Sequence, residues 1–297
     1  MLGNEKLSPN LPDCLPVASY TDKLRQEKRK IIYRYCTPAG FDIPLNLRLR
    51  ASRIDELNDP FELAFGIQTE TARADVKKDF EESLELLTQW EVILKEQNIS
   101  FKEDSIEDLI EKVVDFQISD LRRVVKLLQD QWKETHGVSC FSKFPDIIQM
   151  WAHYADNHKG LVIGLDEKVL TSNPEEELAI IKYDNDFIRI PVFANPNNIA
   201  LYAPYITETF KRKEEKWGYE KEVRVYINLE EKSLDGRFYR NIPAEAVKEI
   251  YLGLQTDETT EIIAKEIANR EKYKHLNVFK MNVHPDEYKL VPEPIWP

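Results

Sequence analysis

Glycine is scarce in this sequence, and the motifs that depend on it are absent. The chain has 297 residues and 9 glycines, about 3% where ~7% is usual. No G-x-G-x-x-G follows a strand-like run, and no G-x-x-x-x-G-K-[ST] occurs anywhere. These absences exclude the Rossmann and P-loop types of phosphate-binding site.

Cysteine is also rare, and its spacing excludes the common zinc motifs. Cys14, Cys36 and Cys140 form no C-x-x-C pair, and no H-E-x-x-H occurs. A zinc finger or a zincin is therefore not supported. Three scattered cysteines fit a reducing compartment better than a disulfide-linked scaffold.

Long hydrophobic runs are missing as well. Stretches such as residues 161–165 are far shorter than the ~20 residues that cross a bilayer. The first fourteen residues, MLGNEKLSPNLPDC, lack the apolar region of a secretory signal. We therefore expect a cytoplasmic protein that does not enter membranes.

Positive charge is in deficit. The formal net charge is −12, which argues against broad, non-specific nucleic-acid binding, since such binding needs a basic face. Hydrophobic residues make up 42% of the chain and aromatic residues 10%, enough for a substantial core.

The pattern along the chain predicts an α+β fold. We expect an irregular tail at residues 1–19 and one α+β domain at 20–297. The apolar spacing at residues 71–134 predicts an inserted antiparallel pair of helices, a candidate surface for a partner protein. The other predicted strands are at 31–36, 45–52, 138–142, 160–166, 179–183, 189–193, 219–229, 249–254 and 277–282. The other predicted helices are at 146–155, 199–215 and 256–270. Helices and strands do not alternate regularly, which favours α+β over a doubly wound sheet.

Residues 217–226, WGYEKEVRVY, form the most unusual segment. On a strand, Glu220, Glu222, Arg224 and Tyr226 share one face. Unpaired ions lose several kcal/mol of hydration in a dry core, so this face is expected at solvent or in a polar cleft. It is either a solvated face with a Glu–Arg ion pair or a carboxylate poised at a cleft.

A second segment combines VSCFS at 138–142 with MWAHYA at 150–155 and HKG at 158–160. Trp151 and Tyr154 are neighbours on a helix. Tyr154 also has a ring that can stack on a flat ligand. His153 and His158 lack a third metal ligand at helical spacing, and core packing is the default for Trp151.

Two further segments precede the helical insertion. Arg34, between two tyrosines, suits either an edge-strand ion pair or a bidentate contact to phosphate or carboxylate. Residues 58–62, NDPFE, predict a turn in which Asx side chains bond the following backbone.

Taken in order, these segments resemble a widespread bacterial family, domain of unknown function family 2971. The matching segments are Tyr33-Arg34-Tyr35, Asn58-Asp59-Pro60-Phe61-Glu62, Ser139-Cys140-Phe141-Ser142, Met150-Trp151-Ala152-His153-Tyr154-Ala155, His158-Lys159-Gly160 and Trp217-x-Tyr219-Glu220-x-Glu222-x-Arg224. The resemblance runs from about residue 31 to 290 without the insertion, and it implies no established activity.

The motif order also resembles that of ADP-ribosyltransferases. That resemblance implies an ADP-ribosyltransferase-like core of antiparallel or mixed sheets and cleavage of NAD at the nicotinamide–ribose bond. ADP-ribose would pass to an unknown acceptor. Glu222 would oppose the positive charge that develops on the ribose. Glu220 would act on the acceptor, and Ser139 or Ser142 would orient Glu222.

The same resemblance implies the residues that bind NAD as substrate. Arg34 would pair with the pyrophosphate or the adenosine ribose, and Tyr154 would stack on nicotinamide. Asn58 joins them as a candidate NAD-binding residue. The scheme needs no metal.

Two alternatives stay open. One is a non-catalytic module that binds a nucleotide or a peptide in the same cleft. The other is a metal-dependent nuclease or phosphodiesterase that uses Asp59, Glu62, Glu220 and Glu222 as carboxylate ligands.

Overall fold

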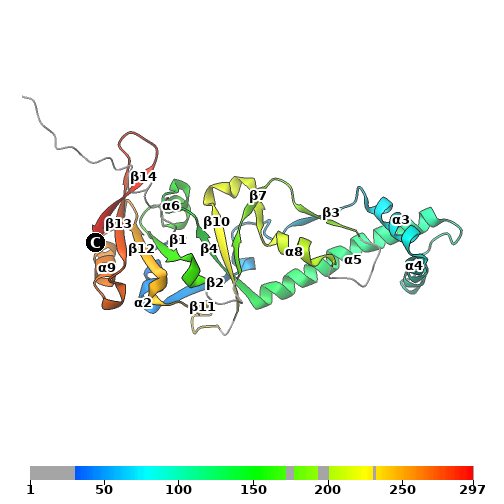
Figure 1. Ribbon diagram of the computed structural model, residues 1–297, viewed down its shortest axis with the longest axis horizontal. Helices are drawn as coiled ribbons and strands as arrows, with labels where there is room; N and C mark the ends of the chain where they lie inside the picture. The colour runs from blue at the N-terminus through cyan, green and yellow to red at the C-terminus, as the bar shows by residue number, and fades with distance from the viewer. Residues whose placement is uncertain (1–30, 172–176, 193–200, 230–231, 297) are drawn as a thin grey trace, which may run out of the picture. The chain divides into compact units, whose positions relative to one another are not determined.

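A computed structural model of the chain describes residues 31–171, 177–192, 201–229 and 232–296 (Figure 1). The tail predicted at residues 1–19 lies outside this part. The chain divides into two compact units. Unit 1 takes Met1–Leu45, Phe144–Val169 and Pro243–Pro297, and unit 2 takes Asn46–Lys143 and Leu170–Ile242. The single domain predicted at 20–297 stays a prediction.

Unit 1 is built on a mixed sheet with the strand order β1-β5-β12-β13-β14. Its strands are β1 (Ile31–Cys36), β5 (Leu161–Asp166), β12 (Val247–Leu252), β13 (Asn277–Val283) and β14 (Leu290–Trp296). Strands β12 and β13 run parallel, and the other neighbours are antiparallel. Its helices are α6 (Ile148–Tyr154) and α9 (Glu258–Ala268). Two more short helices, α2 (Asp42–Asn46) and α7 (Glu167–Leu170), each contain a boundary between the two units.

The sequence of unit 1 accounts for these elements. β5 reads as a continuous apolar run, which suits a strand buried on both faces, and Leu161, Val162 and Ile163 have no exposed surface. Helix α9 begins after Asp257, whose carboxylate accepts the Thr260 amide at 2.7 Å, the usual N-cap contact.

The main strands of unit 2 form a sheet region with the strand order β11-β2-β4-β10-β6. Its strands are β2 (Arg48–Arg53), β4 (His136–Ser142), β6 (Glu177–Ile180), β10 (Glu222–Asn228) and β11 (Phe238–Asn241). Two short parallel pairs accompany it: β3 (Phe65–Gln68) with β8 (Ile188–Pro191), and β7 (Lys182–Asp184) with β9 (Arg212–Glu214). The helices of unit 2 are α3 (Ala72–Glu82), α4 (Leu84–Glu96), α5 (Ile106–Thr135) and α8 (Ala203–Thr209).

The predicted helical insertion is helical, but it contains α3, α4 and α5 where a pair was expected. Ser83 separates the first two helices and caps α4. α5 has 30 residues, a length of about 45 Å at 1.5 Å per residue.

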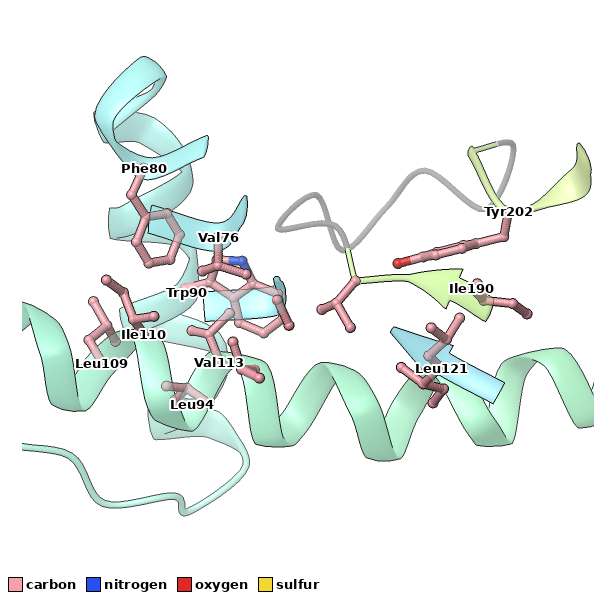
Figure 2. Close-up of a cluster of buried hydrophobic side chains, with 14 of the residues drawn as sticks. Val76, Phe80, Trp90, Leu94, Leu109, Ile110, Val113, Leu121, Ile190 and Tyr202 are labelled. Atoms are coloured by element: carbon pink, nitrogen blue, oxygen red, sulfur yellow. The ribbon is translucent and has the colours of Figure 1, made fainter. Parts of the chain in front are cut away.

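One hydrophobic cluster holds these helices together and extends to the small β3–β8 sheet (Figure 2). Trp90 and Leu94 of α4 are fully buried with Val113 of α5. Further along α5, Leu121 packs into the same cluster as Ile190 of β8. One continuous apolar stripe on α5 therefore packs in the same cluster as the neighbouring helices and the β3–β8 sheet.

Both units combine strands and helices, so the protein is α+β, as predicted. The ADP-ribosyltransferase-like arrangement of the core stays a prediction. Among the described helices, none is both long and apolar enough to span a membrane.

Candidate functional site

The predicted site residues are divided between the two units. Arg34 on β1 and Tyr154 at the end of α6 belong to unit 1. Ser139, Ser142, Glu220, Glu222 and Asn58 belong to unit 2. A cleft that joins the two groups stays a prediction.

The strand predicted at 219–229 begins at Glu222. Glu220 ends the short 3-10 helix η4 (Glu215–Glu220), and Lys221 between them has a left-handed backbone with φ 48°. Left-handed residues break strand geometry, so Glu220 and Glu222 do not alternate along one strand as expected.

Arg224 lies at the centre of a buried ionic cluster. Its Nε donates to Glu222 Oε1 at 2.8 Å, and its Nη2 donates to Glu222 Oε2 at 3.2 Å and to Glu62 Oε2 at 3.0 Å. Its Nη1 donates to Glu62 Oε1 and to the Phe210 carbonyl at 3.5 Å. All five N–H donors of the guanidinium are therefore used.

Lys213 on β9 supplies the second cation. Its Nζ lies 2.7 Å from Glu220 Oε2 and 3.4 Å from Glu222 Oε2. It also lies 4.5 Å from the centre of the Trp217 ring, a cation–π contact. Lys213 thus connects the two predicted catalytic glutamates.

We call Glu62, Lys213, Glu220, Glu222 and Arg224 the ionic cluster. It holds three carboxylates against two cations, so its net charge is −1 when every member is ionised. The side chains are between 1% and 6% exposed. Pairing, and not access to water, is what stabilises these charges.

Burial affects the two carboxylates that flank Arg224 differently. Burial raises the pKa of Glu62, and Arg224 offsets only part of this effect. Burial also acts to raise the pKa of Glu222, but Arg224 and Lys213 together outweigh it and hold this pKa below its usual range. Glu222 is therefore the more firmly ionised of the two.

This geometry corrects the expectation that the face of Glu220, Glu222 and Arg224 meets solvent or a polar cleft. The Glu–Arg ion pair is present, but it is buried, because Glu62 and Lys213 from other segments complete the pairing. Glu222 has both carboxylate oxygens engaged, and its amide donates to the Tyr183 hydroxyl at 2.7 Å.

The two candidate serines donate to backbone carbonyls. Ser142 Oγ donates to the Glu220 carbonyl at 2.7 Å, and Ser139 Oγ donates to the Arg50 carbonyl at 2.8 Å. Ser142 is paired with Glu222 across β4 and β10. Asn58 is exposed, whereas Asp59 is buried and accepts the Phe61 amide at 2.9 Å. This last bond is the Asx contact that the sequence predicted.

The nuclease alternative meets an obstacle in the same geometry. Arg224 bridges Glu62 and Glu222, and Lys213 bridges Glu220 and Glu222. In the parts of the chain that the structure describes, no group of three or more His, Cys, Asp or Glu side chains is placed to hold a metal ion.

A pocket of about 440 Å³ lies elsewhere in unit 2, and it has four rings in its lining. Trp132 stacks on His136 with 4.4 Å between ring centres, and it meets Phe210 at 4.1 Å and Tyr226 at 5.1 Å. We call this the aromatic pocket. Its polar lining residues are Gln131, Thr135, Thr207 and Lys211.

The aromatic pocket and the ionic cluster share one backbone group. The carbonyl of Phe210 accepts hydrogen bonds from Tyr226 Oη and from Arg224 Nη1. Phe210 and Tyr226 are buried lining residues of the pocket. The pocket wall is therefore anchored to the paired charges.

Neither Lys213 nor the aromatic pocket was predicted from the sequence. Lys213 lies in a stretch expected to be helical, and nothing in the run KRKEEK marks one lysine as buried. The rings of the pocket come from α5, β4, β10 and the end of α8, and no local pattern connects them.

Comparison with known proteins adds one finding. Residues 150–225 match the family model described as Protein of unknown function (DUF2971). No curated protein and no solved structure matches the chain. The matched segment includes most of α6 together with Lys213, Glu220, Glu222 and Arg224, and it agrees with the resemblance drawn from the motifs.

Proposed function

We propose that unit 2 is a nucleotide-binding module whose aromatic pocket holds the base. The observation that carries this proposal is the group of four rings around a cavity of about 440 Å³. Small-molecule sites typically measure ~300–1,000 Å³ and combine apolar or aromatic walls with a few polar groups. The pocket meets both conditions.

The polar lining suits the rest of a nucleotide. The hydroxyl oxygens of Thr135 and Thr207 can accept hydrogen bonds from a ribose, since their protons are donated to backbone carbonyls. The Lys211 ammonium has the charge that attracts a phosphate. Contacts between a base and aromatic side chains contribute ~1–3 kcal/mol each and tolerate different bases. We therefore expect that binding requires an aromatic base but depends little on which base it is.

Binding alone is favoured over chemistry by the state of Glu222. A carboxylate that opposes a developing ribosyl cation has to face the substrate. Here both Glu222 oxygens are bonded to Arg224, and the side chain is 5% exposed. ADP-ribosyl transfer stays a prediction, and it requires Glu222 to exchange Arg224 for the substrate.

The test is calorimetric titration of the full chain with AMP, NAD and ribose 5-phosphate. Two matched variants locate the site: Thr207→Trp, which fills the aromatic pocket, and Thr88→Trp on α4. Both threonines are exposed helix residues whose hydroxyl bonds the carbonyl four residues earlier, at 2.9 Å and 3.2 Å. Only Thr207 lines the pocket.

AMP and NAD are expected to bind wild type and Thr88→Trp alike, whereas Thr207→Trp weakens binding at least about tenfold. Ribose 5-phosphate, which lacks the ring, is expected to bind poorly. Equal binding by both tryptophan variants would overturn the pocket assignment. Release of nicotinamide from NAD in the same samples would restore the transferase prediction.

A further inference from the structure

An unusual left-handed turn follows α6 in unit 1. Asp156, Asn157 and His158 have φ values of 48°, 50° and 67° in succession. Asn and Asp adopt this conformation with little difficulty, but for other residues it costs ~1–2 kcal/mol. His158 is therefore held where an ordinary side chain is strained, and such positions often serve a function.

Hydrogen bonds on both sides hold this turn in place. The His158 amide donates to the Trp151 carbonyl at 3.2 Å, and the His158 carbonyl accepts the Gln255 amide at 2.9 Å. Gly253 permits this approach, because a Cβ there would lie 2.1 Å from the His158 carbonyl oxygen. The conformation is thus determined by the surrounding fold.

The turn presents the His158 ring in one orientation. The ring lies nearly parallel to that of Trp151, at 7° and 6.2 Å between centres. Its Nδ1 is buried without a hydrogen-bond partner among the described residues. Nδ1 has no partner whether it donates or accepts, and orphaned buried N–H donors are rarer in proteins than orphaned acceptors. The neutral form with the proton on Nε2 is therefore favoured. Burial also lowers the pKa of His158.

His158 lines a cavity of about 580 Å³ together with the loop between β13 and β14. Its walls combine apolar residues such as Leu254, Pro285 and Tyr288 with the polar side chains of His284, Glu287 and Lys289. Asp286 also lines it, and its carboxylate has no ion pair or hydrogen bond from the parts of unit 1 that the structure describes. The Lys289 ammonium is paired with Glu287 at 2.7 Å.

We propose that this cavity binds an uncharged, largely apolar molecule through a primary carboxamide. The carboxamide oxygen accepts from Nε2–H of His158, and its NH₂ group donates to the Asp286 carboxylate. An anion would face the Asp286 carboxylate, and among the described lining residues the Lys289 ammonium is already paired with Glu287. A simple ammonium ion would leave the His158 donor without an acceptor.

The probe is benzamide, with benzoate and benzylamine as comparators of similar size. The full chain contains 5 histidines, so its imidazole nitrogen signals can be followed individually by NMR. We expect free His158 to show the neutral Nε2–H form. Benzamide is expected to shift the His158 signals and to bind at least about tenfold more tightly than either comparator.

Two matched variants locate the binding. His158→Asn removes the imidazole, and asparagine tolerates the left-handed conformation. His153→Asn makes the same change at an exposed position of α6. Benzamide binding should weaken at least about tenfold in His158→Asn and stay unchanged in His153→Asn. Thermal unfolding of both variants confirms that each is folded.

Three results would overturn the proposal. One is benzoate or benzylamine binding as tightly as benzamide. Another is full benzamide affinity in folded His158→Asn. The third is a His158 ring that carries its proton on Nδ1 at neutral pH.

Discussion

Replacement of Arg224 by methionine tests whether the ionic cluster is held together by charge pairing. The substitution removes five hydrogen bonds and leaves three buried carboxylates with one cation. The net charge of the cluster changes from −1 to −2, and Glu62 loses its ion pair with Arg224. Removing one partner of a buried pair typically destabilises a protein by ~3–5 kcal/mol.

This loss is measurable by urea unfolding and by thermal unfolding, each followed by circular dichroism. For a unit of this size, 1 kcal/mol corresponds to ~2–4 °C, so we expect the melting temperature to fall by about 6–20 °C. Acidification should reduce the difference from wild type, because protonation of the unpaired carboxylates removes their repulsion.

The matched control is Arg212→Met. Arg212 pairs with Asp184 at 2.6 Å, but the two side chains are 28% and 45% exposed. Exposed pairs contribute ~0–1 kcal/mol, so this variant should lose no more than about 1 kcal/mol. An equal, small loss in both arginine variants would refute the view that pairing at Arg224 stabilises unit 2.

Three further predictions concern single residues. Glu222→Gln should destabilise the protein by about 1–2 kcal/mol, less than Arg224→Met, because each cation keeps one glutamate. The pKa of Glu222 is lowered in the folded state. The difference in stability between wild type and Glu222→Gln should therefore shrink as pH falls below the ordinary carboxyl pKa of about 4.3. A difference that grows on acidification would contradict the direction of that shift. The pKa of Glu62 is raised in the folded state, so its pH dependence has the opposite sign: ionisation of Glu62 destabilises the fold as pH rises above about 4.3. Between about pH 4.3 and 7, wild type should therefore lose more stability than Glu62→Gln in the same unfolding series. Gly253→Ala should lower the melting temperature, because the new Cβ would lie 2.1 Å from the His158 carbonyl oxygen. The control Gly66→Ala should leave the melting temperature unchanged, because the nearest atom to its new Cβ is 3.7 Å away. Equal melting temperatures for the two variants would contradict the close approach at Gly253.

The strands with the clearest apolar patterns were predictable from sequence. β1 has the predicted bounds, and β5 begins one residue later than predicted. β14 was not predicted, because Pro292 and Pro294 argue against a strand. β14 stands at the end of the strand order, next to β13, and is therefore an edge strand. An edge strand tolerates both prolines because the backbone on its open side needs no N–H donors for pairing.

The candidate site was predictable in its residues but not in their pairing. The motifs identified Glu62, Glu220, Glu222 and Arg224, yet the sequence placed three of them at solvent or in a cleft. The contact between Glu62 and Arg224 joins residues 162 positions apart, and Lys213 comes from a stretch expected to be helical. Pairing at such separations depends on tertiary structure, which local patterns do not encode.

The most direct test of the nucleotide-binding proposal is an AMP titration followed through the indole N–H signals of the 5 tryptophans. Trp132 lines the aromatic pocket, whereas Trp217 lies over Lys213 of the ionic cluster. We predict that AMP shifts the Trp132 signal in a saturable way and leaves the Trp217 signal in place. A saturable shift at Trp217 with none at Trp132 would contradict the account and place the nucleotide beside Glu222.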